Sequence, residues 1–150
     1  MIEFIHISLG YLALVSGLIV LLMKKGGRTH RFVGLIYFFS MLGLNLTAFG
    51  IYKLYDGWGF FHWMAIASLI PLLAGYFAIR HKKIEAHYYF MCWSYIGLLC
   101  ATVSEIFVHI PAAETLLNKV PHIDTAFMLC LIGAGFYFLP KNQHRYVRKV

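Results

Sequence analysis

Long apolar runs separated by short polar stretches make up almost the whole chain. Each run is close to the roughly 20 residues that a helix needs to cross the hydrocarbon core of a bilayer. The pattern predicts five transmembrane helices, with expected ranges 4–23, 32–52, 60–79, 87–109 and 123–139. We therefore expect an all-α integral membrane protein whose single transmembrane domain spans residues 1–150.

The first four predicted helices form two similar hairpins. His6 and His30 open the helices of the first hairpin, and His62 and His87 open those of the second, at offsets of 56 and 57 residues. This spacing is typical of a degenerate tandem repeat, and equally of two unrelated hairpins of similar length. We expect the four helices to form a bundle and the fifth to lie at its periphery. In a bundle with sequential connections, the first and third helices are diagonal, as are the second and fourth.

The composition excludes an ordinary soluble protein. Hydrophobic residues make up 61% of the chain and charged residues 13%, with a mean hydropathy of +0.72, so much of the apolar surface must face lipid. The five spans leave no room for a soluble catalytic domain. The net charge of +7 does not indicate nucleic acid, because the basic residues lie between the apolar runs and form no single patch.

The basic residues are unevenly divided between the predicted loops. Eleven of the thirteen lie after the first, third and fifth helices: Lys24, Lys25, Arg28, Arg31, Arg80, Lys82, Lys83, Lys141, Arg145, Arg148 and Lys149. Only Lys53 and Lys119 lie in the alternate loops. The positive-inside rule therefore predicts a multi-pass protein of the cytoplasmic membrane, with the N-terminus outside and the C-terminus in the cytoplasm. Pro140 is expected to end the fifth helix, and Pro111 and Pro121 to bracket an outer loop.

Four histidines are expected at two levels of this bundle. His6 and His62 start helices that run inward, whereas His30 and His87 start helices that run outward. Diagonal helices of a bundle lie about 12 to 14 Å apart, which suits a porphyrin held by two imidazoles. The haem hypothesis thus uses an outer pair, an inner pair and two glycines one turn beyond a histidine, namely His6, His62, His30, His87, Gly10 and Gly34. Two haem b groups at these levels would form a transmembrane electron path. The alternative is that each histidine merely marks a membrane interface.

A second hypothesis places one metal ion at the outer level. Glu105 and His109 are four residues apart and share a helix face. The candidate ligands for zinc or copper are His6, His62, Glu105, His109 and His122. The simpler expectation for Glu105 is a pairing with a neighbouring helix or with water. A third reading is a non-catalytic assembly subunit of a membrane complex, and the sequence does not decide whether the chain is an enzyme.

Several of these motifs together carry a resemblance to a known family. They are His6, Gly10 and Gly17, the run GRTHRFVGLIY at 27–37, the pair Phe61 and His62, and the run HYYFM at 87–91. With them the chain resembles an uncharacterised family of bacterial membrane proteins, catalogued as domain of unknown function 2306. The resemblance covers about residues 6 to 109 and implies the architecture alone.

The four histidines also give a looser resemblance to four-helix di-haem cytochrome b proteins that ascorbate or quinol reduces. That resemblance implies transmembrane electron transfer, with a quinone or a respiratory-chain partner in addition to the lipid bilayer, and it leaves a homo-oligomer open. His30 and His87 depart from that group because they lie at the very edges of their spans, which favours the outer haem over the inner one. Small four-helix factors that assist assembly of haem-copper oxidases are similar at the level of the fold.

Overall fold

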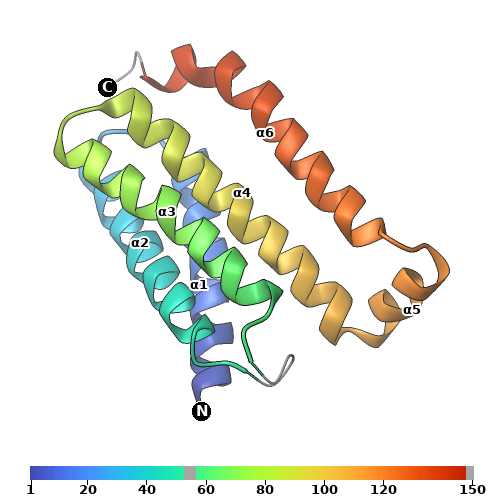
Figure 1. The fold of residues 1–150 in the computed structure, drawn as a ribbon. Coiled ribbons are helices and arrows are strands. Elements are labelled where there is room, and N and C mark those ends of the chain that lie inside the picture. Colours follow the sequence, from blue (N-terminus) through green and yellow to red (C-terminus); the bar gives the residue numbers. More distant parts are fainter. Residues whose placement is uncertain (53–56, 148–150) are drawn as a thin grey trace.

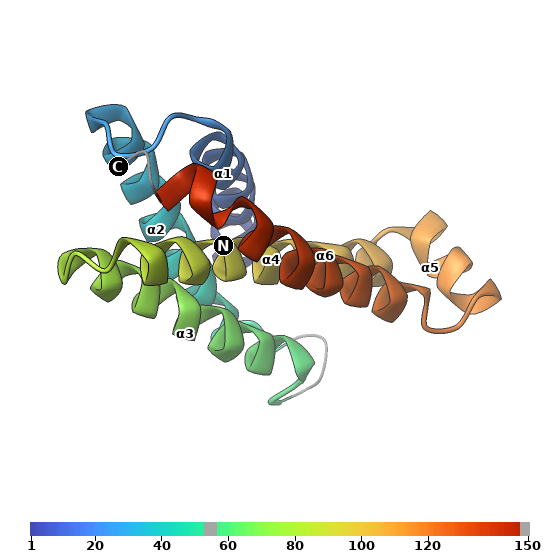
Figure 2. The same ribbon diagram turned by 90° about the horizontal axis from the view of Figure 1, so that it is seen from above.

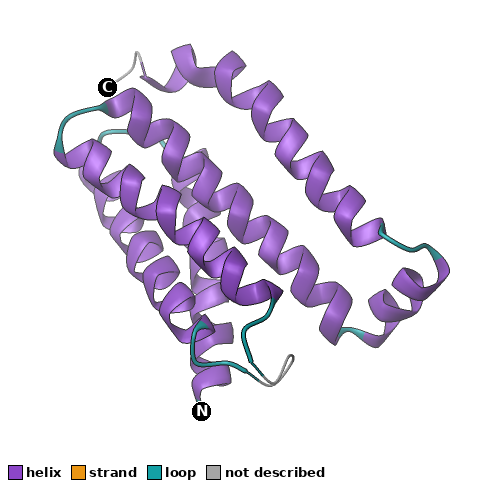
Figure 3. Cartoon of the chain, viewed as in Figure 1, coloured by secondary structure: helices purple, strands orange, loops and turns teal. Residues whose placement is uncertain are grey.

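Helices account for nearly all of the structure. A computed structural model describes residues 1–52 and 57–147, together with their side chains except those of Phe60 and residues 144–147. The helices are α1 (Ile2–Leu22), α2 (Arg28–Ala48), α3 (Phe60–Arg80), α4 (Ile84–His109), α5 (Pro111–Lys119) and α6 (Ile123–Val147) (Figures 1 and 3). All of these except α5 are long and apolar enough to cross a membrane. The predicted all-α fold with five spans is confirmed.

The helices form two hairpins and a peripheral helix. α1 packs against α2 and α3 against α4, and the two hairpins meet mainly where α2 contacts α3. α6 runs alongside α4, while α5 lies farthest from the first hairpin (Figure 2). α1 and α3 are therefore diagonal, as are α2 and α4. The predicted bundle of two hairpins with a fifth, peripheral span is confirmed.

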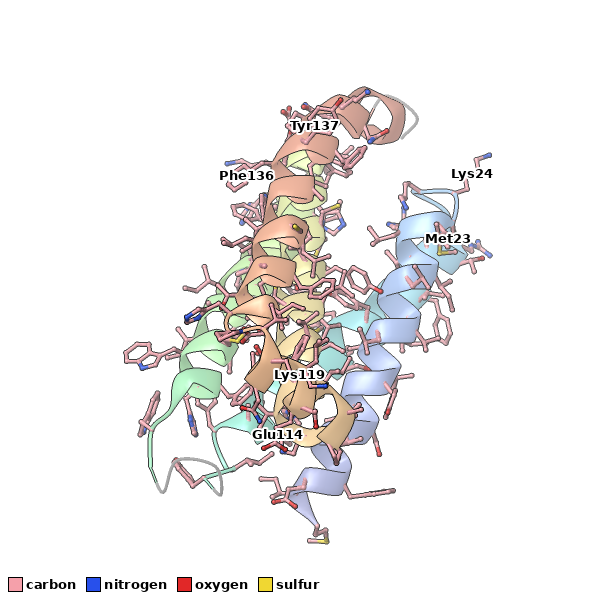
Figure 4. The ribbon with its side chains drawn as sticks, turned by 90° about the vertical axis from the view of Figure 1, so that its right-hand side faces the viewer. Met23, Lys24, Glu114, Lys119, Phe136 and Tyr137 are labelled. Atoms are coloured by element: carbon pink, nitrogen blue, oxygen red, sulfur yellow. The ribbon has the colours of Figure 1, made fainter. Side chains whose placement is uncertain are left out.

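The two ends of the bundle differ in chemistry. One end holds the connections 23–27 and 81–83 and is called the basic end below. The opposite end holds the N-terminus and the described residues 49–52 and 57–62, and is called the aromatic end. Lys24 lies at the basic end, far from Glu114 and Lys119 of α5 (Figure 4). Because the helices alternate in direction, His30 and His87 come to the basic end and His6 and His62 to the aromatic end, as expected.

The core lies between these two levels and contains polar groups that are satisfied within it. Its buried apolar residues are Ala13, Tyr37, Phe38, Met41, Leu72, Tyr95 and Leu98. The Tyr37 hydroxyl pairs with the Ser94 hydroxyl at 2.9 Å, and the Tyr95 hydroxyl donates to the Leu14 carbonyl at 3.1 Å. Polar groups inside a bilayer need such partners because lipid offers none. These bonds join α2 and α1, respectively, to α4.

Replacing Tyr37 with phenylalanine is expected to lower the free energy of unfolding by about 0.5 to 1.5 kcal/mol, because it leaves the buried Ser94 hydroxyl without its partner. Reversible unfolding by SDS in mixed micelles measures this difference. Tyr11→Phe is the matched control, since Tyr11 is 69% exposed. Equal losses in both variants would contradict a role for the Tyr37 bond.

The connection that Pro111 and Pro121 bracket contains the short helix α5. Proline suits its first turn, where the missing N–H costs no helical bond. The structure corrects the prediction for Pro140. Pro140 does not end the last helix, because α6 continues to Val147. Two hydrogen bonds join this continuation to α4, Tyr89 to Gln143 and Gln143 to Glu85, and Tyr88 donates to the Leu139 carbonyl directly before the proline. The remaining helix ends lie within four residues of the predicted ranges.

Candidate functional site

His87 at the basic end is oriented by the backbone of α3. Its Nδ1 donates a hydrogen bond to the Gly75 carbonyl at 2.8 Å. α3 and α4 come this close because position 75 is glycine: a Cβ there would lie 2.7 Å from the Met91 sulfur and 3.3 Å from the Phe90 Cβ. A neutral imidazole protonated on Nδ1 keeps its lone pair on Nε2. Metal-ligating histidines have this arrangement, in which the nitrogen that does not bind is fixed by a carbonyl.

His30 lies near His87 and has an unsatisfied nitrogen. It occupies the first turn of α2 and is half-buried, and its Nδ1 is buried without a hydrogen-bond partner in the part of the chain that the structure describes. His87 is close enough to act electrostatically on His30, as are Lys25 and Arg31. The predicted inner pair, from the diagonal helices α2 and α4, therefore lies at the same end of the bundle within electrostatic range, without a direct hydrogen bond or ring contact between the two imidazoles among the described residues.

The positive charge beside His30 is held in place by the end of α1. The Lys25 ammonium donates to the carbonyls of Val20 and Leu21, which have no partner within the helix at this end. Burial lowers the pKa of the Lys25 ammonium, because desolvation disfavours its charged form. Lys25 and Arg31 together make this end a suitable place for a carboxylate.

The two glycines of the haem hypothesis have different surroundings. A Cβ at Gly34, one turn after His30, would meet nothing within 4 Å, so this face of α2 is open. A Cβ at Gly10 would make an ordinary contact with Leu44 at 3.6 Å. The predicted role of Gly34, to leave room beside a histidine, is compatible with the structure, whereas Gly10 packs against α2.

His6 at the aromatic end pairs with the neighbouring helix of its own hairpin. Its Nδ1 lies 2.9 Å from the Thr47 hydroxyl, which itself donates to the carbonyls of Gly43 and Leu44. Thr47 therefore accepts the bond, and the Nε2 of His6 keeps its lone pair. Glu105 of α4 also acts electrostatically on His6.

His62 caps the start of α3 and has the opposite tautomer. Its Nδ1 accepts a hydrogen bond from the Gly59 N–H at 3.2 Å, so the proton of the neutral ring lies on Nε2. An Nε2 that carries a proton has no lone pair for a metal. No hydrogen bond, ring contact or electrostatic interaction joins His62 to His6 among the described residues. The structure does not bring the predicted outer pair together.

The alternative metal ligands are also dispersed. Glu105 and His109 form an ion pair at 3.0 Å, with side chains 45% and 60% exposed, and such an exposed pair contributes little stability. His122 is exposed and lies in the left-handed backbone conformation, with φ of 66°. Within the ranges 1–52 and 57–147, no three histidine, cysteine, aspartate or glutamate side chains gather around a possible metal position. The five candidate ligands, His6, His62, Glu105, His109 and His122, therefore form no common site.

Sequence reasoning missed the residues that orient these histidines. Thr47 and Gly75 become partners only through packing between helices, and no local spacing in the sequence indicates them. The bond from the Gly59 N–H to His62 is the half of a capping box in which the side chain three residues on reaches back, but glycine and histidine are not the residues that signal this motif in a sequence.

Comparison with known proteins gives one match. A family model described as "Predicted membrane protein (DUF2306)" matches residues 3–140. No curated protein and no solved structure shows significant similarity to the chain. The match reaches from the first turn of α1 to Pro140 in α6, so it includes nearly all of the membrane-spanning part.

Proposed function

The chain belongs to the DUF2306 family of predicted membrane proteins, and for this member we propose a b-type haem-binding, electron-carrying function, with His30 and His87 as the axial pair. The observation that carries the proposal is the bond from His87 Nδ1 to the Gly75 carbonyl, which turns the lone pair of Nε2 away from α3. His30 supplies a second imidazole nearby, with a buried nitrogen that lacks a partner in the described ranges.

The residues at the basic end have separate roles in this proposal. His87 and His30 would hold the iron from two diagonal helices, so the haem would also join the two hairpins. Lys25 and Arg31 would neutralise the haem carboxylates. The open face at Gly34 leaves space beside α2. When bound, the haem supplies one-electron chemistry, while the protein sets its position and its degree of burial.

We limit the proposal to one haem per chain. At the aromatic end, His62 Nδ1 accepts the Gly59 N–H, so no lone pair remains at its Nε2 for an iron opposite His6. Electron exchange would then occur at the basic end, with a partner in or at the membrane.

Purification in mild detergent tests the proposal. We expect a dithionite-reduced spectrum of b type and, from the pyridine haemochrome, about one haem per chain. Colourless protein with stoichiometric zinc would instead favour the metal-ion alternative, and colourless protein without metal would favour the assembly subunit. Two haems per chain would contradict the limit to one.

We also propose that the basic end faces the cytoplasm, on the ground of the positive-inside rule. In a variant without native cysteines, His122→Cys is expected to react with a membrane-impermeant maleimide in intact cells. His81→Cys, the matched position at the basic end, is expected to react only after the cells are permeabilised. Both histidines are exposed, so accessibility within the protein does not bias the comparison. The reverse labelling pattern would contradict this orientation.

A further inference from the structure

The aromatic end contains a buried imidazole enclosed by three other rings. We call Phe49, Tyr52, Trp58 and His62 the aromatic cluster. The His62 ring lies 5.1 Å from the Tyr52 ring and 5.2 Å from the Trp58 ring, nearly stacked on the first at 28° and tilted by 34° to the second. Phe49 lies 6.5 Å away on the α2 side. His62 itself is only 3% exposed.

The Nε2 of His62 is a hydrogen-bond donor without an acceptor. The Gly59 N–H occupies Nδ1, so the ring proton lies on Nε2. That atom is buried and has no partner in the described part of the chain. A buried donor without an acceptor costs about 1 to 3 kcal/mol, and native proteins rarely leave one unless a ligand or water completes it.

The cluster is also accessible to a ligand from its surroundings. Tyr52 is 44% exposed and Trp58 is 59% exposed, so two of the rings that contact the buried His62 are themselves at the surface of the protein. Exposed side chains change rotamer within nanoseconds, so the two rings are free to adjust around a ligand that stacks on them. The cluster lies at one end of the membrane-spanning bundle, where a lipid-soluble molecule arrives from the bilayer.

We propose that the aromatic cluster binds a flat ring bearing a carbonyl oxygen, of the quinone class, and that this oxygen accepts the hydrogen bond of His62 Nε2. The stacked rings suit a planar ligand, which gains from offset or tilted contacts with them. Besides the exposed Tyr52 hydroxyl and Trp58 indole N–H, the cluster offers one buried N–H donor, that of His62, and none of its four side chains is an acid, a lysine or an arginine, which suits an uncharged carbonyl better than a lipid phosphate. This site lies at the opposite end of the bundle from the proposed haem, and neither proposal depends on the other.

Calorimetric titration of the whole protein in detergent tests the site, with decylubiquinone as the probe and empty micelles as the blank. We expect saturable binding to the unmodified chain. His62→Asn keeps an acceptor near the position of Nδ1 but has nothing at the position of Nε2, and it is expected to bind about tenfold more weakly. His62→Gln reaches the position of Nε2 with an amide N–H and is expected to stay within about threefold of the unmodified chain.

Several outcomes would overturn the proposal. They are the absence of saturable binding, equal affinity in the two variants, and displacement of the quinone by equimolar short-chain phosphatidylcholine, which would identify a lipid carbonyl as the occupant. If His62→Asn fails to fold, Trp58→Leu replaces it. That change removes a ring wall without touching the α3 cap, and unchanged affinity would count against the site. The haem spectrum is recorded in parallel, because His62 is not a ligand at the basic end and its replacement leaves that spectrum intact.

Discussion

Replacing His87 with alanine is expected to lower the haem content of the purified protein at least tenfold. The change removes one of the two proposed iron ligands and its hydrogen bond to the Gly75 carbonyl. A bis-imidazole site with one ligand missing loses both affinity and the low-spin character of the iron. The reduced-minus-oxidised spectrum and the pyridine haemochrome measure the loss directly.

The matched control for this prediction is His81→Ala. His81 lies at the same end of the bundle, directly after α3, and is exposed. Its replacement removes an imidazole of the same kind without changing the proposed site, and the haem content is expected to be unaffected. A full spectrum in the His87 variant would exclude His87 as a ligand, and an equal loss in both variants would indicate general destabilisation.

The second large effect is expected at Gly17, where Gly17→Ala should reduce the stability of the bundle by about 1 to 3 kcal/mol. A Cβ at this position would lie 2.4 and 2.5 Å from atoms of the Tyr95 ring and 2.9 Å from the Tyr37 ring. Neither ring is free to move away, because hydrogen bonds tie Tyr95 to Leu14 and Tyr37 to Ser94. The added methyl group must therefore separate α1 from α4 or break a tyrosine bond.

Unfolding by SDS in mixed micelles measures this loss against Gly133→Ala. Gly133 lies in α6, where a Cβ would meet nothing within 4 Å. Alanine favours a helix over glycine, so this control is expected to be neutral or slightly stabilising. If Gly17→Ala were as stable as the control, the close packing of Gly17 against Tyr37 and Tyr95 would be contradicted.

The sequence predicted the membrane architecture well because lipid imposes a strong, local constraint. A span must be apolar over about 20 residues, and that property is read directly from the chain. The helix α5 was not predicted, because its nine residues of mixed polarity do not form a long apolar run. The continuation of α6 past Pro140 was not predicted, because its contacts with α4, from Gln143 to Tyr89 and Glu85, join residues far apart in the sequence.

The sequence predicted the level of each histidine but not its partner. Helix direction alone places His30 and His87 at one end and His6 and His62 at the other. A single hydrogen bond decides which nitrogen of a histidine ring is left to bind a ligand. The bond from His87 to Gly75 arises from helix packing, and the bond from Gly59 to His62 arises from helix capping. For this reason the sequence favours the outer pair, whereas our proposal uses the inner one.

Paramagnetic resonance of the oxidised protein reads both axial ligands of a haem iron at once. With His30 and His87 as the axial pair, we predict a low-spin ferric signal in the unmodified chain and its conversion to a high-spin signal in His30→Ala. A high-spin signal in the unmodified chain, or an unchanged low-spin signal in His30→Ala, would contradict the pairing of these two histidines.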